Sequence, residues 1–189
     1  PKSPLLPTLL MKRSYKDLIK GLTSNDRVCL SKLISSIESD SSSIFRIINS
    51  VKRLPNKTYT IGVTGPPGAG KSTLTNQIIK KFRGMNFKIG VIAIDPSSPF
   101  TGGAVLGDRV RMQEHSLDTS VFIRSVGSRG DLGGLSSSTS SMIKLFDIFG
   151  MDIVIIETVG VGQTELDIIK ISDSVLVTLV PEAGDGIQA

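Results

Sequence analysis

The chain has 189 residues, of which 39% are hydrophobic and 21% are charged. This composition excludes a disordered chain, and the length is that of one domain with a hydrophobic core. No apolar run approaches the roughly 18 residues of a membrane span, so we expect no such span. The single Cys and single His exclude a disulfide framework and leave little for a structural zinc site.

The formal net charge is +5, and the positive charge is concentrated near the N-terminus. Residues 1–57 carry 11 basic and 4 acidic residues, whereas residues 58–189 carry 11 basic and 13 acidic ones. A basic segment can contact phosphate or an acidic partner, although it is more often a solvated helix face. The segment contains only two aromatic residues that could stack on bases, Tyr15 and Phe45, so we expect no nucleic-acid partner.

The N-terminal part is predicted to be helical. The helical spacing i, i+3, i+4, i+7 recurs twice among apolar residues, in Leu30, Leu33, Ile34 and Ile37 and in Ile44, Ile47, Ile48 and Val51. Ser24 or Asn25 is the expected N-cap of the first of these helices. We interpret residues 1–54 as a helical arm and residues 55–189 as a separate domain.

From residue 58 onward, short β-branched runs alternate with helical stretches. The runs predict strands at Tyr59–Thr64, Lys88–Asp95, Val121–Ser125, Asp152–Glu157 and Ser174–Val180. Each run is almost continuously apolar, as in parallel strands that are buried on both faces. The alternation predicts an α/β fold with a doubly wound, mostly parallel sheet and helices on both of its faces.

The segment Gly65-Pro66-Pro67-Gly68-Ala69-Gly70-Lys71-Ser72 matches the phosphate-binding pattern G-x-x-x-x-G-K-[ST]. It follows the first predicted strand and precedes a predicted helix from Lys71 to about Phe82. Glycines let backbone N–H groups turn toward a phosphate, the lysine reaches the β- and γ-phosphates, and the serine hydroxyl ligates Mg²⁺. The pattern predicts a P-loop NTPase that binds nucleotide through these residues and Thr73.

Acidic residues end two of the predicted strands, at the edge of the sheet where ligands gather in open α/β folds. Asp95 ends the second strand and Glu157 ends the fourth, so we expect both to join Ser72 at Mg²⁺. Glu157 also begins a Glu-x-x-Gly pattern, in which the N–H of Gly160 could contact the γ-phosphate. Asp108 could join the same metal shell.

The position after that glycine bears on the hydrolysis rate. Ras-like enzymes place a water-orienting Gln there, whereas this chain has Val161, with Gln163 two residues further on. We therefore expect slow intrinsic hydrolysis, completed by a partner or a second copy. Arg124 and Arg129 are candidate phosphate-contacting or trans-acting groups, and an exposed ion pair is an equal alternative for each.

Several quoted motifs occur in order along the chain, at Gly65–Ser72, Asp95–Gly103, Leu106–Arg109, Arg129–Gly134, Glu157–Gln163 and Pro181–Asp185. With them, the chain from about residue 18 to its end closely resembles the MeaB/MMAA/ArgK family of methylmalonyl-CoA mutase-associated GTPases. The resemblance implies a homodimeric chaperone that gates adenosylcobalamin delivery to, and protects, an adenosylcobalamin-dependent acyl-CoA mutase. It implies GTP as substrate, GDP as product and Mg²⁺ as cofactor, in the cytoplasm or, in a eukaryote, the mitochondrial matrix.

The resemblance also implies residue roles. Lys71, Asp108 and Glu157 are the expected catalytic residues, Ser72, Asp95 and Glu157 the expected metal ligands, and residues 158–165 a switch. The guanine-reading N-K-x-D motif is expected beyond residue 189, so we expect the GTPase domain to be incomplete at its C-terminus. GTP rather than ATP is therefore implied by the resemblance, and no residue of the chain reads the base.

Three other functions are compatible with the same phosphate loop. A nickel-insertion metallochaperone GTPase shares the Glu-x-x-Gly switch but needs Cys and His ligands, of which this chain has one each. An ATP-dependent small-molecule kinase or transport-associated ATPase would use the loop to position ATP. A nucleotide-dependent binding module would hydrolyse nucleotide only incidentally.

Overall fold

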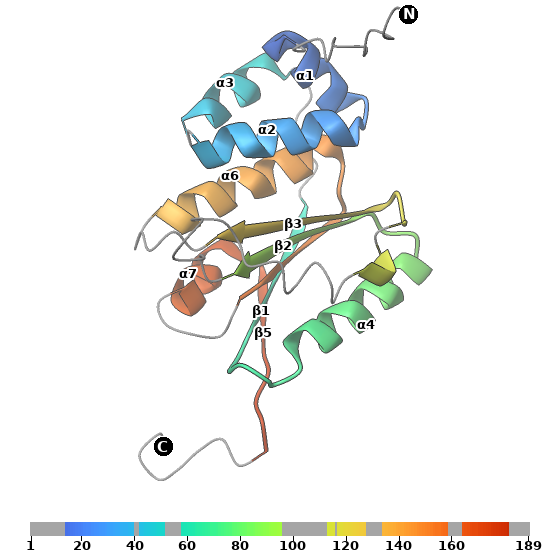
Figure 1. The fold of residues 1–189 in the computed structure, drawn as a ribbon, viewed down its shortest axis with the longest axis vertical. Helices are drawn as coiled ribbons and strands as arrows, with labels where there is room; N and C mark the ends of the chain where they lie inside the picture. Colours follow the sequence, from blue (N-terminus) through green and yellow to red (C-terminus); the bar gives the residue numbers. More distant parts are fainter. Residues whose placement is uncertain are drawn as a thin grey trace, which may run out of the picture.

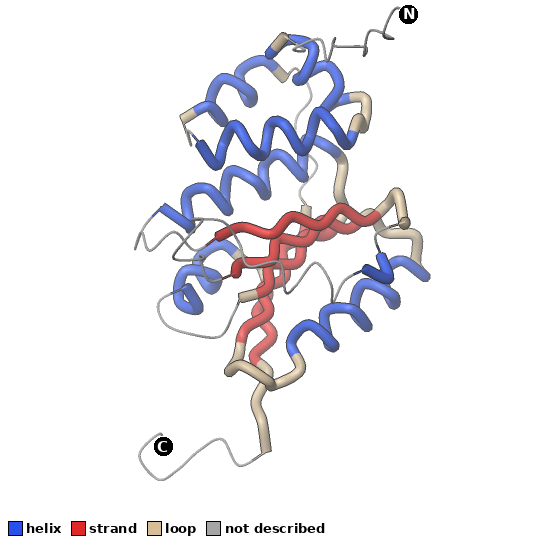
Figure 2. The backbone as a smooth tube through the Cα atoms, in the orientation of Figure 1, coloured by secondary structure: helices blue, strands red, loops and turns tan. Residues whose placement is uncertain are grey.

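The computed structural model describes residues 14–39, 42–51, 58–95, 113–115, 117–127, 134–158 and 164–181. Its helices are α1 (Tyr15–Thr23), α2 (Arg27–Ser39), α3 (Ser43–Ser50), α4 (Lys71–Gly84), the short 3₁₀ helix η1 (Gln113–His115), α6 (Gly134–Phe149) and α7 (Thr164–Ile171). Its strands are β1 (Tyr59–Thr64), β2 (Ile89–Asp95), β3 (Val121–Gly127), β4 (Ile153–Glu157) and β5 (Ser174–Val177). The strands pair in parallel in one sheet of order β3-β2-β4-β1-β5 (Figure 1, Figure 2).

Helices cover both faces of the sheet, as the alternating sequence pattern predicts. α4 lies on one face, where its Ile79 joins a buried cluster that includes Val63, Val91 and Ile155 of the strands. α6 and α7 lie on the other face, and α1 to α3 form an outer layer against α6 (Figure 1). The arrangement confirms the α/β class and the doubly wound parallel sheet.

The strand boundaries differ from the predicted ones mainly at two ends. β3 continues to Gly127 because it remains paired with β2 as far as Asp95. β5 ends at Val177, three residues earlier than predicted, because its partner β1 ends opposite it at Thr64, where the chain turns away. The remaining strands agree with their predicted ranges to within one residue.

The predicted N-cap of α2 is wrong. The cap is Asp26, whose Oδ1 accepts hydrogen bonds from the backbone N–H groups of Val28 at 2.8 Å and Cys29 at 3.3 Å. Ser24 instead lies at the C-terminal end of α1, and Asn25 follows it with a left-handed φ of 61°. Asn adopts that conformation more readily than most residues, so the turn between the two helices uses it there.

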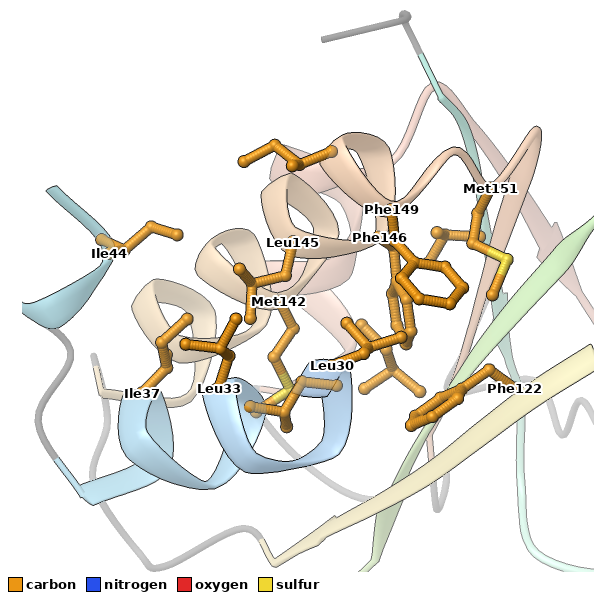
Figure 3. Packing of buried hydrophobic residues seen from close by; sticks show 14 of the residues in the cluster. Leu30, Leu33, Ile37, Ile44, Phe122, Met142, Leu145, Phe146, Phe149 and Met151 are labelled. Carbon is orange, nitrogen blue, oxygen red and sulfur yellow. The ribbon is translucent and has the colours of Figure 1, made fainter. Parts of the chain in front are cut away.

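The core between α2, α6 and the sheet is apolar and closely packed (Figure 3). Leu30 and Leu33 of α2 belong to the same buried cluster as Met142 and Phe146 of α6. The ring of Phe146 meets that of Phe122 edge to face, with 5.7 Å between the ring centroids. The same cluster includes residues of α1 and α3 as well as residues of the strands. The predicted division of the chain near residue 54 stays a prediction.

A largely buried ion pair fastens α2 to strand β3. Arg124 of β3 pairs with Glu38 of α2, and these side chains are only 18% and 19% exposed. Nη2 of Arg124 also donates to Oγ of Ser35 at 3.1 Å. Of the roles predicted for Arg124, the structure shows an ion pair, but the pair is largely buried against α2 and not exposed as predicted.

Replacing Glu38 with Ala is expected to lower the free energy of unfolding by about 2 kcal/mol, because it leaves the largely buried guanidinium of Arg124 without its carboxylate. Urea denaturation of the wild-type protein and of the Glu38→Ala variant measures the difference in the free energy of unfolding. Glu114→Ala is the matched control, since Glu114 pairs with Lys80 while both side chains remain about half exposed or more. Equal losses in the two variants would contradict the assignment of the Arg124 pair as a stabilising contact.

The far end of α4 is held by the segment that contains η1. Nζ of Lys80 lies 2.6 Å from Oε2 of Glu114, and Nε of Arg83 lies 2.8 Å from Oδ2 of Asp118. The hydrogen bond from Arg83 holds the pKa of Asp118 below its usual value, and burial lowers the pKa of His115. The segment therefore anchors the helix whose first residues belong to the phosphate motif.

Within the described ranges, no helix is both long and apolar enough to cross a membrane.

Candidate functional site

The loop between β1 and α4 has the backbone conformation that its glycines predict. Gly65, Gly68 and Gly70 have φ values of 135°, 81° and 83°, a region that residues with a Cβ rarely adopt. A Cβ on Gly65 would lie 2.2 Å from the carbonyl oxygen of Thr178, whereas at Gly68 and Gly70 it would meet no described heavy atom within 4 Å. The loop is thus tightly packed where it begins and open further along.

Lys71 is the first residue of α4, and its side chain folds back over the loop. Its Nζ donates hydrogen bonds to the carbonyl oxygens of Gly65 at 2.7 Å and Pro66 at 2.9 Å. The residue is only 7% exposed, so the ammonium group is held close to the loop backbone. The charge therefore lies beside the N-terminal end of α4, where backbone N–H groups also favour an anion.

Ser72 and Glu157, which are far apart in the sequence, meet at the same edge of the sheet. Oγ of Ser72 donates a hydrogen bond to Oε1 of Glu157 at 2.5 Å. Glu157 is the last residue of β4 and is 4% exposed, with Val63 of β1 and Ala93 of β2 opposite it on either side. The structure thus brings together two of the predicted metal ligands, whereas Thr73, the next residue of α4, is exposed.

The chemistry of this oxygen pair fits Mg²⁺. In the described part of the chain, no group of three or more His, Cys, Asp or Glu side chains could hold a metal ion. A serine hydroxyl and one carboxylate are nevertheless a suitable donor set, because Mg²⁺ prefers oxygen ligands and usually keeps several waters and substrate phosphates. The residues present therefore fit a magnesium ion that is shared with a bound nucleotide.

Other predicted site residues are placed only in part. Asp95 is the last residue of β2, which confirms its position at the carboxyl edge of the sheet, while its side chain lies outside the described residues. Asp108, Arg129 and Gly160 also lie outside them. Their assigned roles remain predictions.

Sequence reasoning missed Thr64 and Thr178, which lie beside the phosphate loop, and included Thr158 only as the first residue of the predicted switch. Oγ1 of Thr178 donates to the carbonyl oxygen of Thr64 at 3.1 Å, and its backbone N–H donates to the same oxygen at 2.8 Å. Oγ1 of Thr158 donates a hydrogen bond to Oγ1 of Thr64 at 3.2 Å. Thr64 ends one predicted strand and Thr158 follows another, whereas Thr178 lies inside the predicted strand Ser174–Val180. The sequence therefore carries no common signal that could have marked all three.

Comparisons with known proteins agree with this geometry. The sequence profile of the family described as methylmalonyl Co-A mutase-associated GTPase MeaB matches residues 30–189. A protein of Pyrococcus horikoshii that is named as a GTPase is 51% identical over 172 residues, which are 91% of this chain and 54% of that protein. The mitochondrial methylmalonic aciduria type A homolog of Mus musculus is 36% identical over 191 residues, covering 94% of this chain and 46% of that protein.

A solved structure is also similar to this chain. The crystal structure of a LAO/AO transport system kinase superposes with a TM-score of 0.69 at 27% identity, covering 90% of this chain and 51% of that one. The chain spans about half the length of the curated relatives it matches. Since the family profile extends from α2 through the phosphate loop to residue 189, the chain belongs to the methylmalonyl-CoA mutase-associated GTPase family, MeaB.

Proposed function

We propose that this chain binds and hydrolyses GTP at the loop between β1 and α4. The observation that carries the proposal is the meeting of three groups at one edge of the sheet. The Lys71 ammonium lies over the loop backbone, and the Ser72 hydroxyl bonds the Glu157 carboxylate. A phosphate-binding cation beside a pair of oxygen ligands is the arrangement that nucleoside triphosphates require. Membership of a GTPase family supports guanine as the base.

Each group has a proposed role. Lys71 exchanges its contacts with the loop carbonyls for contacts with the β- and γ-phosphates, because a charge-assisted bond to phosphate is stronger than one to a neutral carbonyl. Ser72 and Glu157 hold Mg²⁺, with Asp95 and Asp108 as further predicted contributors. When bound, Mg²⁺ neutralises charge on the phosphate oxygens.

The proposed biological role is that of a chaperone for an adenosylcobalamin-dependent acyl-CoA mutase. The family description names a methylmalonyl-CoA mutase-associated GTPase, and that of the mouse relative names methylmalonic aciduria. In this role, the GTPase cycle controls when the cofactor is delivered to the mutase, and the chaperone protects the mutase. We propose a homodimeric protein, located in the cytoplasm or in the mitochondrial matrix of a eukaryote.

A nucleotide titration of the full-length protein tests the proposed activity. GTP should displace bound fluorescent GDP at lower concentrations than ATP does, and hydrolysis of GTP should require Mg²⁺. Tighter binding of ATP than of GTP would overturn the assignment and favour a kinase, the function named for the superposed crystal structure. Hydrolysis that accelerates when a cobalamin-dependent mutase is added would support the chaperone role, and an unchanged rate would count against it.

A further inference from the structure

Three threonines from separate parts of the chain meet beneath the phosphate loop. Thr64 ends β1, Thr158 directly follows Glu157 at the end of β4, and Thr178 directly follows β5. Thr64 and Thr158 are buried, at 5% and 2% exposed, and Thr178 is partly buried. Thr64 is the common member, because its carbonyl oxygen and its hydroxyl are each bonded by one of the other two.

Thr178 supports the half of the site that contains Lys71. Its hydroxyl and its backbone N–H both donate to the carbonyl oxygen of Thr64, the residue immediately before the loop. Its carbonyl and hydroxyl oxygens lie 2.2 and 2.3 Å from the point that a Cβ on Gly65 would occupy. Thr178 thus packs against Gly65, whose carbonyl is one of the two acceptors that hold Nζ of Lys71.

Thr158 supports the half that contains Glu157. Its backbone N–H donates to the carbonyl oxygen of Val63 at 3.1 Å, which continues the pairing of β4 with β1 by one residue. Its hydroxyl lies between two acceptors, Oγ1 of Thr64 at 3.2 Å and the carbonyl oxygen of Val63 at 3.5 Å. These bonds fix the backbone directly after Glu157, and hence the carboxylate that accepts from Ser72.

We infer that Thr158 and Thr178 are positioning residues for nucleotide binding, each acting on a different half of the site through Thr64. Thr178 positions the part of the site that contains Lys71, which contacts phosphate with or without a metal ion. Thr158 positions the part of the site that contains Glu157, which contributes to nucleotide binding only when Mg²⁺ is present. This inference rests on the proposed nucleotide-binding function.

Affinity for fluorescent GDP, measured on the full-length protein in Mg²⁺ and in EDTA, tests the inference. Thr178→Val removes the hydroxyl at nearly constant volume and should weaken GDP binding about tenfold in both conditions. Thr158→Val should weaken binding about tenfold in Mg²⁺ and leave it within about twofold of wild type in EDTA. Thr158→Ser and Thr178→Ser keep the hydroxyl and should each recover most of the affinity that the corresponding valine variant loses.

Thr75→Val is the matched control for a buried threonine near the loop. Thr75 is fully buried on α4, and its Oγ1 has no hydrogen-bond partner in the described part of the chain. This variant should bind GDP as the wild type does in both conditions. Thermal unfolding of all variants separates lost stability from lost positioning.

The outcomes are distinguishable. Equal Mg²⁺ dependence of Thr158→Val and Thr178→Val, or serine variants as weak as the valine ones, would overturn the inference and leave the proposed function standing. A wild-type protein that binds neither GDP nor ADP would overturn the proposed function, and this inference with it.

Discussion

Replacing Lys71 with Ala is expected to weaken triphosphate binding at least a hundredfold, to the limit of a direct titration. The ammonium lies over the loop backbone, where Nζ bonds two loop carbonyls. Each charge-assisted bond to phosphate contributes more than a neutral one, and alanine can form none. Fluorescent GTP-analogue titration of the full-length protein measures the loss.

Lys80→Ala is the appropriate control for that experiment. Lys80 lies on the same helix, and its half-exposed side chain pairs with Glu114, away from the phosphate motif. The control variant should retain wild-type affinity. If Lys71→Ala bound the analogue as well as Lys80→Ala does, the loop between β1 and α4 would not be the nucleotide site.

Replacing Glu157 with Gln is expected to lower the hydrolysis rate by about a hundredfold or more while nucleotide still binds. The amide can still accept the hydrogen bond that Ser72 donates at 2.5 Å, so the local geometry is retained. What is lost is the negative charge that makes the carboxylate a ligand for Mg²⁺. The Mg²⁺ concentration for half-maximal hydrolysis should therefore rise together with the fall in rate.

Glu157→Asp provides the rescue arm of this experiment. Aspartate restores the carboxylate on a shorter side chain and converts the local pattern to the Asp-x-x-Gly of many other GTPases. We expect it to recover part of the rate that glutamine loses. A glutamine variant with an unchanged Mg²⁺ requirement would show that this carboxylate does not act on the metal.

The strands and the phosphate loop could be predicted from the sequence because local chemistry determines both. Val91 and Ile155 belong to nearly continuous apolar runs, which are typical of strands buried on both faces. Gly65 and Gly70, the two glycines before the lysine that the motif requires, both have positive φ. Lys71 and Ser72 were predicted correctly as neighbours of the loop because the motif and the helix that follows it are contiguous.

Contacts between distant segments could not be predicted in this way. Ser72 and Glu157 are predicted to share a metal site because both lie at the carboxyl edge of a parallel sheet, but the hydrogen bond between them is not predicted. The Glu38–Arg124 pair depends on how α2 lies against β3, which no local pattern encodes. The role of Thr178 depends on β5 ending where β1 ends, which is a property of the register between two strands.

The order of the strands has a further consequence for the carboxylate. β4 lies between β2 and β1, so the backbone that carries Glu157 is paired on both sides, and Thr158 continues the pairing beyond it. Such a central strand opens only when most of the domain unfolds. Glu157 is therefore a rigid reference point, and any rearrangement that accompanies the nucleotide cycle must occur in the segments that move relative to it.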